Sequence, residues 1–262
     1  MRLLLLVCTA CGRLAFDPLA TPGTDGGGDD AGAQTIHVVQ VAGPNIVSNV
    51  TSTSVTFVDA PVIGNVIVVW VWTFKAGASS FDGTNVSDNL TNTYEMAVAD
   101  NEAQGACDGA TGTAAVAVFS TYVTMSGVFT VSVTPTGGPS QQIGLVAIEY
   151  EGLAGIVDAT AHLETTGTAS PMTFTSGTIV TTPGDRLIAA VGDTCSGFPN
   201  TDTWMETSGF TVRAMTGNTT TAQPGIATEL ITNVPGTHSD AWALEYTGSG
   251  PDPGIGAIVA FR

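Results

Sequence analysis

Basic residues are scarce in this chain. Only 6 of its 262 residues are Lys or Arg, against 23 Asp or Glu, which gives a formal net charge of −17. The six cations lie far apart in the sequence and form no cluster. Proteins hold phosphate backbones and anionic lipids through clustered Lys and Arg. The composition therefore excludes nucleic-acid binding and electrostatic docking on an anionic lipid surface.

The chain also lacks the common catalytic motifs. It has no G-x-S-x-G for a hydrolase, no G-x-x-x-x-G-K-[ST] for phosphates and no H-E-x-x-H for zinc. Its three histidines, His37, His162 and His238, are too far apart for ligand spacing. Glycoside hydrolases need two carboxylates that flank a cleft. Acidic residues at predicted strand ends, such as Glu149 and Glu245, keep that class as a minor alternative, and we expect no enzyme.

The N-terminus has the pattern of an export signal. Residues 1–11 read MRLLLLVCTAC, with one positive charge, a short apolar run and two small residues before Cys11. This run is too short to span a bilayer. Small residues directly before a cysteine resemble the lipobox of bacterial lipoproteins. That resemblance implies a signal peptide over 1–10 and a lipid attached to Cys11.

The next segment is predicted to be a tether. Residues 11–34 are rich in Gly, Asp, Pro and Thr and offer little to bury, which is typical of a flexible, acidic linker. Its start, CGRLAFDPL, resembles the mature start of lipoproteins from myxobacteria and their relatives. The expected location is the outer membrane or cell surface, with the lipid on Cys11 as the membrane contact.

The remaining cysteines fit an oxidising compartment. Cleavage removes Cys8 and acylation uses Cys11, which leaves Cys107 and Cys195 as an even pair in an exported chain. Both lie in Gly-rich segments, and neither has a Lys, Arg or His near it in the sequence to activate a thiolate. We therefore predict a Cys107–Cys195 disulfide, with a reactive thiol as the alternative.

From residue 35 onward the pattern is that of an all-β protein. Apolar and polar residues alternate with period two, as in Phe129–Thr134 and Trp242–Tyr246, between Gly, Pro and Asn turns. Such a pattern predicts an antiparallel β-sandwich of about fourteen strands, with the apolar run Val66–Phe74 at the centre of a sheet. Trp70, Trp72 and Phe74 share one face of that run, which is typical of a sandwich core.

A weak internal repeat runs through this region. TFVDAPVIGNVIVVWV (56–71) parallels TIVTTPGDRLIAAV (178–191), and IGLVAI (143–148) parallels IGAIVA (255–260). The echo indicates an ancient duplication. Because no polar linker separates the copies, we expect a single sandwich over 35–262. Two tandem sandwiches, 35–153 and 154–262, are the alternative.

Several short motifs resemble a known group of domains. VSDNLTNTY (86–94) is similar to the V-x-D-x-x-G-N-T-Y segment of large bacterial secreted β-sandwich domains, and AIEYEGL (147–153) to their E-Y-x-G-L segment. Gly64-Asn65 and Gly184-Asp185 match a strand-start motif of the same group. The resemblance covers roughly 36–262 and implies a jelly-roll-like fold on cell-surface proteins, with no assigned catalytic residues.

Two stretches suggest binding. FDGTNVSDN (81–89) brings hard oxygen donors together, so Asp82, Asn85 and Asp88 are candidate ligands for Ca²⁺, although Asp-Gly and Ser-Asp also form ordinary turns. Phe198 and Trp204, in a polar segment, are the candidate exposed aromatics for a ligand ring. We expect the 196–208 and 80–92 segments to meet at one end of the sandwich, where loops carry function.

Three functions follow from these features. The first is a lipid-anchored surface module for binding or adhesion, with a glycan or another surface polymer as its ligand. The second is a structural surface or coat protein without a small-molecule ligand, and the third is a glycoside hydrolase. The sequence contains no feature that predicts the oligomeric state, and apart from Ca²⁺ it suggests no cofactor.

Overall fold

A computed structural model gives the structure of this chain. It describes residues 35–75, 80–101, 103–107, 110–140, 142–167, 170–184, 186–194, 203–215, 225–245 and 252–262. These residues all belong to one compact unit, Ala33–Arg262. They form antiparallel strands and turns, which confirms the predicted all-β class. No helix among them is long and apolar enough to cross a bilayer.

The strands are labelled β1 to β19 in chain order, more than the about fourteen expected for a sandwich of this length. Their bounds are β1 His37–Val47, β2 Thr53–Thr56, β3 Val66–Lys75, β4 Val86–Asp88, β5 Glu95–Asp100, β6 Ala103–Cys107, β7 Ala110–Tyr122, β8 Thr130–Val133, β9 Gln142–Glu151, β10 Val157–Gly167, β11 Met172–Thr175, β12 Ile179–Thr181, β13 Arg186–Thr194, β14 Thr203–Glu206, β15 Thr211–Met215, β16 Gly225–Thr232, β17 Gly236–His238, β18 Ala241–Glu245 and β19 Asp252–Phe261.

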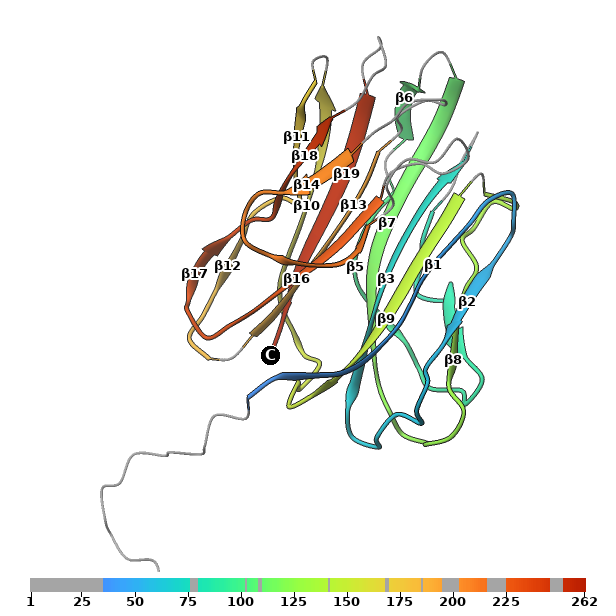
Figure 1. The fold of residues 1–262 in the computed structure, drawn as a ribbon, viewed down its shortest axis with the longest axis vertical. Helices are drawn as coiled ribbons and strands as arrows, with labels where there is room; N and C mark the ends of the chain where they lie inside the picture. Colours follow the sequence, from blue (N-terminus) through green and yellow to red (C-terminus); the bar gives the residue numbers. More distant parts are fainter. Residues whose placement is uncertain are drawn as a thin grey trace, which may run out of the picture. The chain divides into compact units, whose positions relative to one another are not determined.

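Each half of the chain forms one large sheet and one three-stranded sheet (Figure 1). The order of the strands within these sheets is the same in both halves. The first large sheet runs β1-β9-β3-β7-β5, with β6 paired to β7, and the second runs β10-β19-β13-β16-β15. The small sheets run β2-β8-β4 and β11-β18-β14, and β12 pairs with β17. Apart from β6 in the first half and β12 and β17 in the second, each strand thus has a counterpart in the other half. The strand order supports the duplication that the sequence predicts.

Each half is a sandwich with its own core. In the first half, the outer face of the large sheet packs on the small sheet, for example through Phe119 and Val131. In the second half, Ile188 and Ala260 pack on Phe174 and Trp242 in the same way. The halves are called the first repeat and the second repeat below, and Gly152–Ile156 is called the linker.

A third core joins the two repeats. The inner faces of the large sheets share one apolar cluster, with Trp70 from β3, Val191 from β13 and Val259 from β19 among its members. β7 contacts both β13 and β19, and β5 contacts β10, so the large sheets lie face to face. The two repeats are therefore two sandwiches with a common core, an arrangement that combines features of both domain interpretations.

The strand β3 shows why the apolar run lies at the centre. Val66, Val68 and Trp70 face the shared core, while Ile67 and Val69 face the core of the first repeat. β-Branched and aromatic residues fill both faces of a pleated strand without polar gaps. The strand pairs with β9 on one side and β7 on the other. The predicted central position is confirmed.

Candidate functional site

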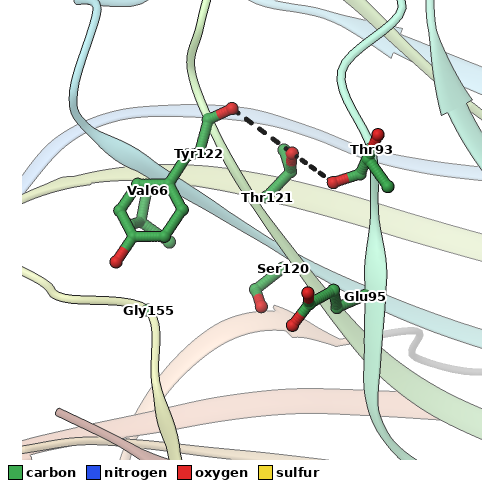
Figure 2. A pocket seen from close by; sticks show the side chains of 7 residues that line it. All are labelled: Val66, Thr93, Glu95, Ser120, Thr121, Tyr122 and Gly155. Atoms are coloured by element: carbon green, nitrogen blue, oxygen red, sulfur yellow. Dashed lines mark hydrogen bonds between the residues drawn. The ribbon is translucent and has the colours of Figure 1, made fainter.

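A small pocket lies where the linker passes the first repeat (Figure 2). Its volume is about 100 Å³, much less than that of the clefts of about 300–1,000 Å³ that enclose whole ligands. It can therefore hold only one edge of a ligand. The lining residues are Val66, Thr93, Glu95, Ser120, Thr121, Tyr122 and Gly155.

Strand pairing sets the polar wall of the pocket. Glu95 on β5 lies directly opposite Ser120 on β7, and Tyr122 lies opposite Val66 on β3. Directly opposed residues of antiparallel strands share one face of the sheet, so these four side chains lie on the same side. The Thr121 hydroxyl donates to the carbonyl oxygen of Thr93 at 2.7 Å and holds the two strands together beside the pocket.

The linker forms the other wall. Gly155 has a φ of 65°, a left-handed conformation that favours glycine. A methyl group there would lie 3.2 Å from Val66 Cγ2 and 3.4 Å from the Tyr122 ring. The linker backbone thus packs closely on the ends of β3 and β7. The Tyr122 ring remains about half exposed beside it.

The pocket has the chemistry of a site for hydroxyl-rich ligands. Figure 2 shows the Glu95 carboxylate, the Ser120 hydroxyl and the Tyr122 ring around the same opening. A carboxylate accepts hydrogen bonds from ligand hydroxyls, a serine can donate or accept, and an aromatic ring packs on apolar ring edges. None of the lining residues is a cation. This set fits a neutral polyol or sugar better than an anion.

The sequence did not predict the pocket, although the order of apolar and polar residues on β7 indicates its position. Val116 and Val118 point into the shared core, and Ser120 and Tyr122 follow them on the same face. A strand face that turns from apolar to polar indicates where burial ends. The role of Gly155 depends on how the linker packs, and alternation within one strand does not predict it.

The prediction that Trp204 is exposed is wrong. Trp204 lies on β14, is only 2% exposed and belongs to the core of the second repeat. Its ring centroid is 5.5 Å from that of Phe174 and 6.2 Å from that of Trp242. A large aromatic side chain on the inner face of a small sheet stabilises the fold by this burial. Phe198, its proposed companion, lies outside the described residues.

The predicted calcium ligands have local hydrogen-bond partners. Asp82 accepts hydrogen bonds from the backbone N–H and the hydroxyl of Thr84 at 2.8 and 2.6 Å. Asn85 accepts from the backbone N–H of Asp82 and donates to the carbonyl oxygen of Thr134. The contacts of Asp82 with Thr84 and Asn85 are those of a turn, the alternative that the sequence left open, and the bond to Thr134 ties this turn to the segment after β8.

Asp88 belongs to the next turn. Its carboxylate accepts from the backbone N–H of Leu90 at 2.7 Å and from the Asn92 side chain at 3.0 Å. Asn92 in turn accepts from the Thr124 hydroxyl at 2.6 Å. Among the described residues, no group of three or more His, Cys, Asp or Glu is placed to hold a metal ion.

Glu149, one of the carboxylates considered for hydrolysis, is fully buried. It accepts hydrogen bonds from the backbone N–H of Val62 at 2.7 Å, the Asn65 side chain at 2.6 Å and the Gln40 side chain at 2.7 Å. These contacts fix the turn before β3 and the edge strand β1 on β9. Glu149 therefore joins β9, the turn before β3 and β1 through hydrogen bonds to its buried carboxylate.

The cysteine side chains lie outside the described part of the chain. Cys11 and Cys195 are outside the described residues. Cys107 ends β6, which pairs with β7, and only its backbone is placed. The lipid on Cys11 and the Cys107–Cys195 bridge therefore stay predictions.

Comparison of the chain with protein-family models, with curated proteins and with solved structures gives no significant match.

Proposed function

We propose that this chain is a lipid-anchored surface module that binds a glycan, or another hydroxyl-rich surface polymer, without catalysis. The observation that carries the proposal is the pocket of Glu95, Ser120 and Tyr122 beside the linker. Its small volume suits the edge of one sugar ring in a longer chain. Export and anchoring are proposed from the N-terminal pattern, which ends in Cys11.

The pocket supplies the interactions that sugars require. A sugar ring presents hydroxyls along its edge and apolar C–H groups on its faces. Glu95 and Ser120 would hydrogen-bond the hydroxyls, and the exposed face of Tyr122 would pack on the C–H groups. Much of the polymer would stay outside, so single-site binding is expected to be weak and to gain from repeated units.

The test is a glycan array probed with the purified chain, followed by calorimetry with each hit. Tyr122→Ala and Glu95→Gln are expected to weaken binding at least about tenfold, because each removes one of the main contacts. Glu151→Gln is the matched control, since Glu151 is an exposed carboxylate that does not line the pocket. Equal binding by all four proteins would contradict the proposed site, and an array without hits would contradict glycan binding.

The anchor is tested separately with labelled fatty acid in a bacterial host. The parent chain is expected to carry the label, and Cys11→Ser is expected to lose it. Label on the Cys11→Ser chain would contradict the assignment.

A further inference from the structure

Among the described residues, the most exposed large apolar side chains gather at one end of the folded unit. Among the large apolar residues that the structure describes, seven are at least half exposed, and all seven lie on turns, on the linker or on the short β12. In the first repeat and the linker they are Val58, Val62, Ile63, Val128 and Ile156, with Val58 at 92% and Val128 at 74%.

Backbone hydrogen bonds place the two turns of the first repeat together. The N–H of Gly64 donates to the carbonyl oxygen of Val123, and the N–H of Phe57 donates to that of Phe129. The 58–65 and 123–129 turns are therefore neighbours at the end where β3 begins and β7 ends. The linker reaches the same end, because Gly155 packs on Val66 and Tyr122.

The second repeat brings its own exposed residues to this end. Ile156 and Arg262 exchange backbone hydrogen bonds at 3.2 and 3.0 Å, so β10 begins where β19 ends. Arg186, at the start of β13, pairs with Thr232, the last residue of β16. Val180 and Val234 lie on the segments that flank these two positions and are 69% and 63% exposed.

The chain enters the folded unit at this same end. His37, the first residue of β1, pairs with Glu151 at the end of β9, directly before the linker (Figure 1). About 24 residues separate Cys11 from Thr35, and a flexible chain of that length spans roughly 27 Å on average. A lipid on Cys11 would therefore keep this end of the unit near the lipid surface.

We infer that this end, with Val58, Val128 and Val180 at its rim, docks on the lipid surface that carries the anchor. The orientation rests on the proposed anchor, whereas the apolar contact itself does not. The exposed charges at this end include the acidic residues Asp59 and Glu151 as well as Arg262. We therefore expect the contact with lipid to be apolar rather than electrostatic. Insertion of exposed Val and Ile side chains into the interface then supplies the attraction, and zwitterionic lipid suffices.

Docking also narrows the ligand class of the pocket. Val66, Tyr122 and Gly155 line the pocket and belong to the same end. With the rim inserted, the opening lies at the level of lipid head groups. The glycan of the proposed function is then one that the lipid surface itself presents.

The experiment is co-sedimentation of the full chain carrying Cys11→Ser with phosphatidylcholine vesicles, so that no acyl chain contributes. We expect measurable binding that raised salt leaves unchanged. The triple variant Val58→Ser, Val128→Ser and Val180→Ser is expected to have an affinity for the vesicles that is lower by a factor of about ten or more. The control variant Met205→Ser with Val212→Ser, which removes exposed apolar groups elsewhere, is expected to bind like its parent.

A second readout locates the contact. Trp70, Trp72, Trp204 and Trp242 are all buried, so their quenching by brominated lipid gives a low background. Val128→Trp is expected to be quenched by such vesicles, and Met215→Trp is not. No vesicle binding, or equal binding by the triple variant, would overturn the docking surface while leaving the Cys11 label and the glycan array unaffected. Self-association that the triple variant abolishes in sedimentation velocity, without vesicle binding, would assign the surface to a second copy instead.

Discussion

The indole of Trp72, on β3 of the first repeat, lies against Gly225 on β16 of the second repeat. A methyl group at Gly225 would be 2.3 Å from Trp72 Nε1, and one at Gly144 on β9 would be 1.9 Å from its Cε2 atom. Both glycines therefore leave room for one fully buried side chain. Through Trp72, the packing of the shared core depends on residues of both repeats.

The first prediction concerns these glycines. Gly225→Ala and Gly144→Ala are each expected to lower the free energy of unfolding by about 1–3 kcal/mol, because the added methyl displaces Trp72 in a packed core. Gly83→Ala is the control, since nothing lies within 4 Å of a methyl there. Chemical denaturation measures the effect, and Trp72→Leu is expected to reduce the cost of Gly225→Ala. Additive effects in that double-mutant cycle would contradict the contact.

The second prediction concerns a polar contact between the repeats. The Tyr150 hydroxyl, on β9, donates to Glu229 on β16, and Arg213 on β15 donates to the other Glu229 oxygen. Burial raises the pKa of Tyr150, and the Glu229 carboxylate raises it further, so Tyr150 remains a neutral donor. Glu229→Ala is expected to cost about 3–5 kcal/mol, because it leaves Arg213 and Tyr150 without their acceptor.

Removing the hydroxyl alone should cost less. Tyr150→Phe is expected to lower the free energy of unfolding by about 1–2 kcal/mol. Glu245→Ala, at the exposed end of β18, serves as the control and is expected to change it by less than about 0.5 kcal/mol. If Glu229→Ala were no more harmful than Glu245→Ala, the buried contact would have no role in stability.

The third prediction concerns the pH dependence of stability. Burial raises the pKa of Asp240 to about 6, although hydrogen bonds from Ser208 and Thr228 oppose the rise. The Ser208 hydroxyl oxygen lies 2.5 Å from Asp240 Oδ1 and 2.7 Å from Glu206 Oε1. Because one hydroxyl has one proton to donate, two charged carboxylates leave one contact unsatisfied, and a proton on Asp240 completes the network.

A carboxyl group with a raised folded-state pKa binds protons more tightly in the folded state than in the unfolded state. Its stabilising effect is therefore complete below about pH 4 and is lost as the pH rises to about 6, by at most about 3 kcal/mol. Asp240→Asn is expected to flatten this part of the profile in denaturation experiments. Asp193 has a pKa raised by burial and contributes with the same sign, so Asp193→Asn separates the two effects. A profile that Asp240→Asn leaves unchanged would contradict the assignment.

The fourth prediction is the Cys107–Cys195 bridge. Such a bridge would close a loop of about 90 residues and stabilise the fold by up to about 4.5 kcal/mol in the chain-entropy model. Peptide mapping without reductant is expected to recover the linked pair, and reduction is expected to lower the melting temperature. Two free thiols in protein secreted from the host would contradict it.

The sequence predicted the class of the fold and its central strand because alternation and apolar runs are local signals. It also contained the repeat, but with a shift of one residue. The motifs align Val66 with Arg186, whereas in the sheets Val66 and Leu187 take equivalent places at the start of their strands and face the shared core. Arg186 is an extra residue there, and its side chain pairs with Asp158 at 3.1 Å.

The binding residues were harder to predict because exposure depends on tertiary packing. Trp204 lies between Thr203 and Met205 in a short alternating stretch that also fits an exposed loop, and its burial requires Phe174 and Trp242 from distant segments. The pocket forms from three strands and the linker. Neither arrangement has a signal within one stretch of sequence.

The linker has a consequence for how the chain could be rearranged. It joins the end of β9 to the start of β10, and β19 ends at the same side of the unit where β1 begins. A circular permutant that connects Arg262 to Thr35 and opens the chain at Gly155 would therefore keep every strand in place and only exchange the order of the halves. The two repeats share one strand order and one core on a single chain, so their association does not depend on protein concentration.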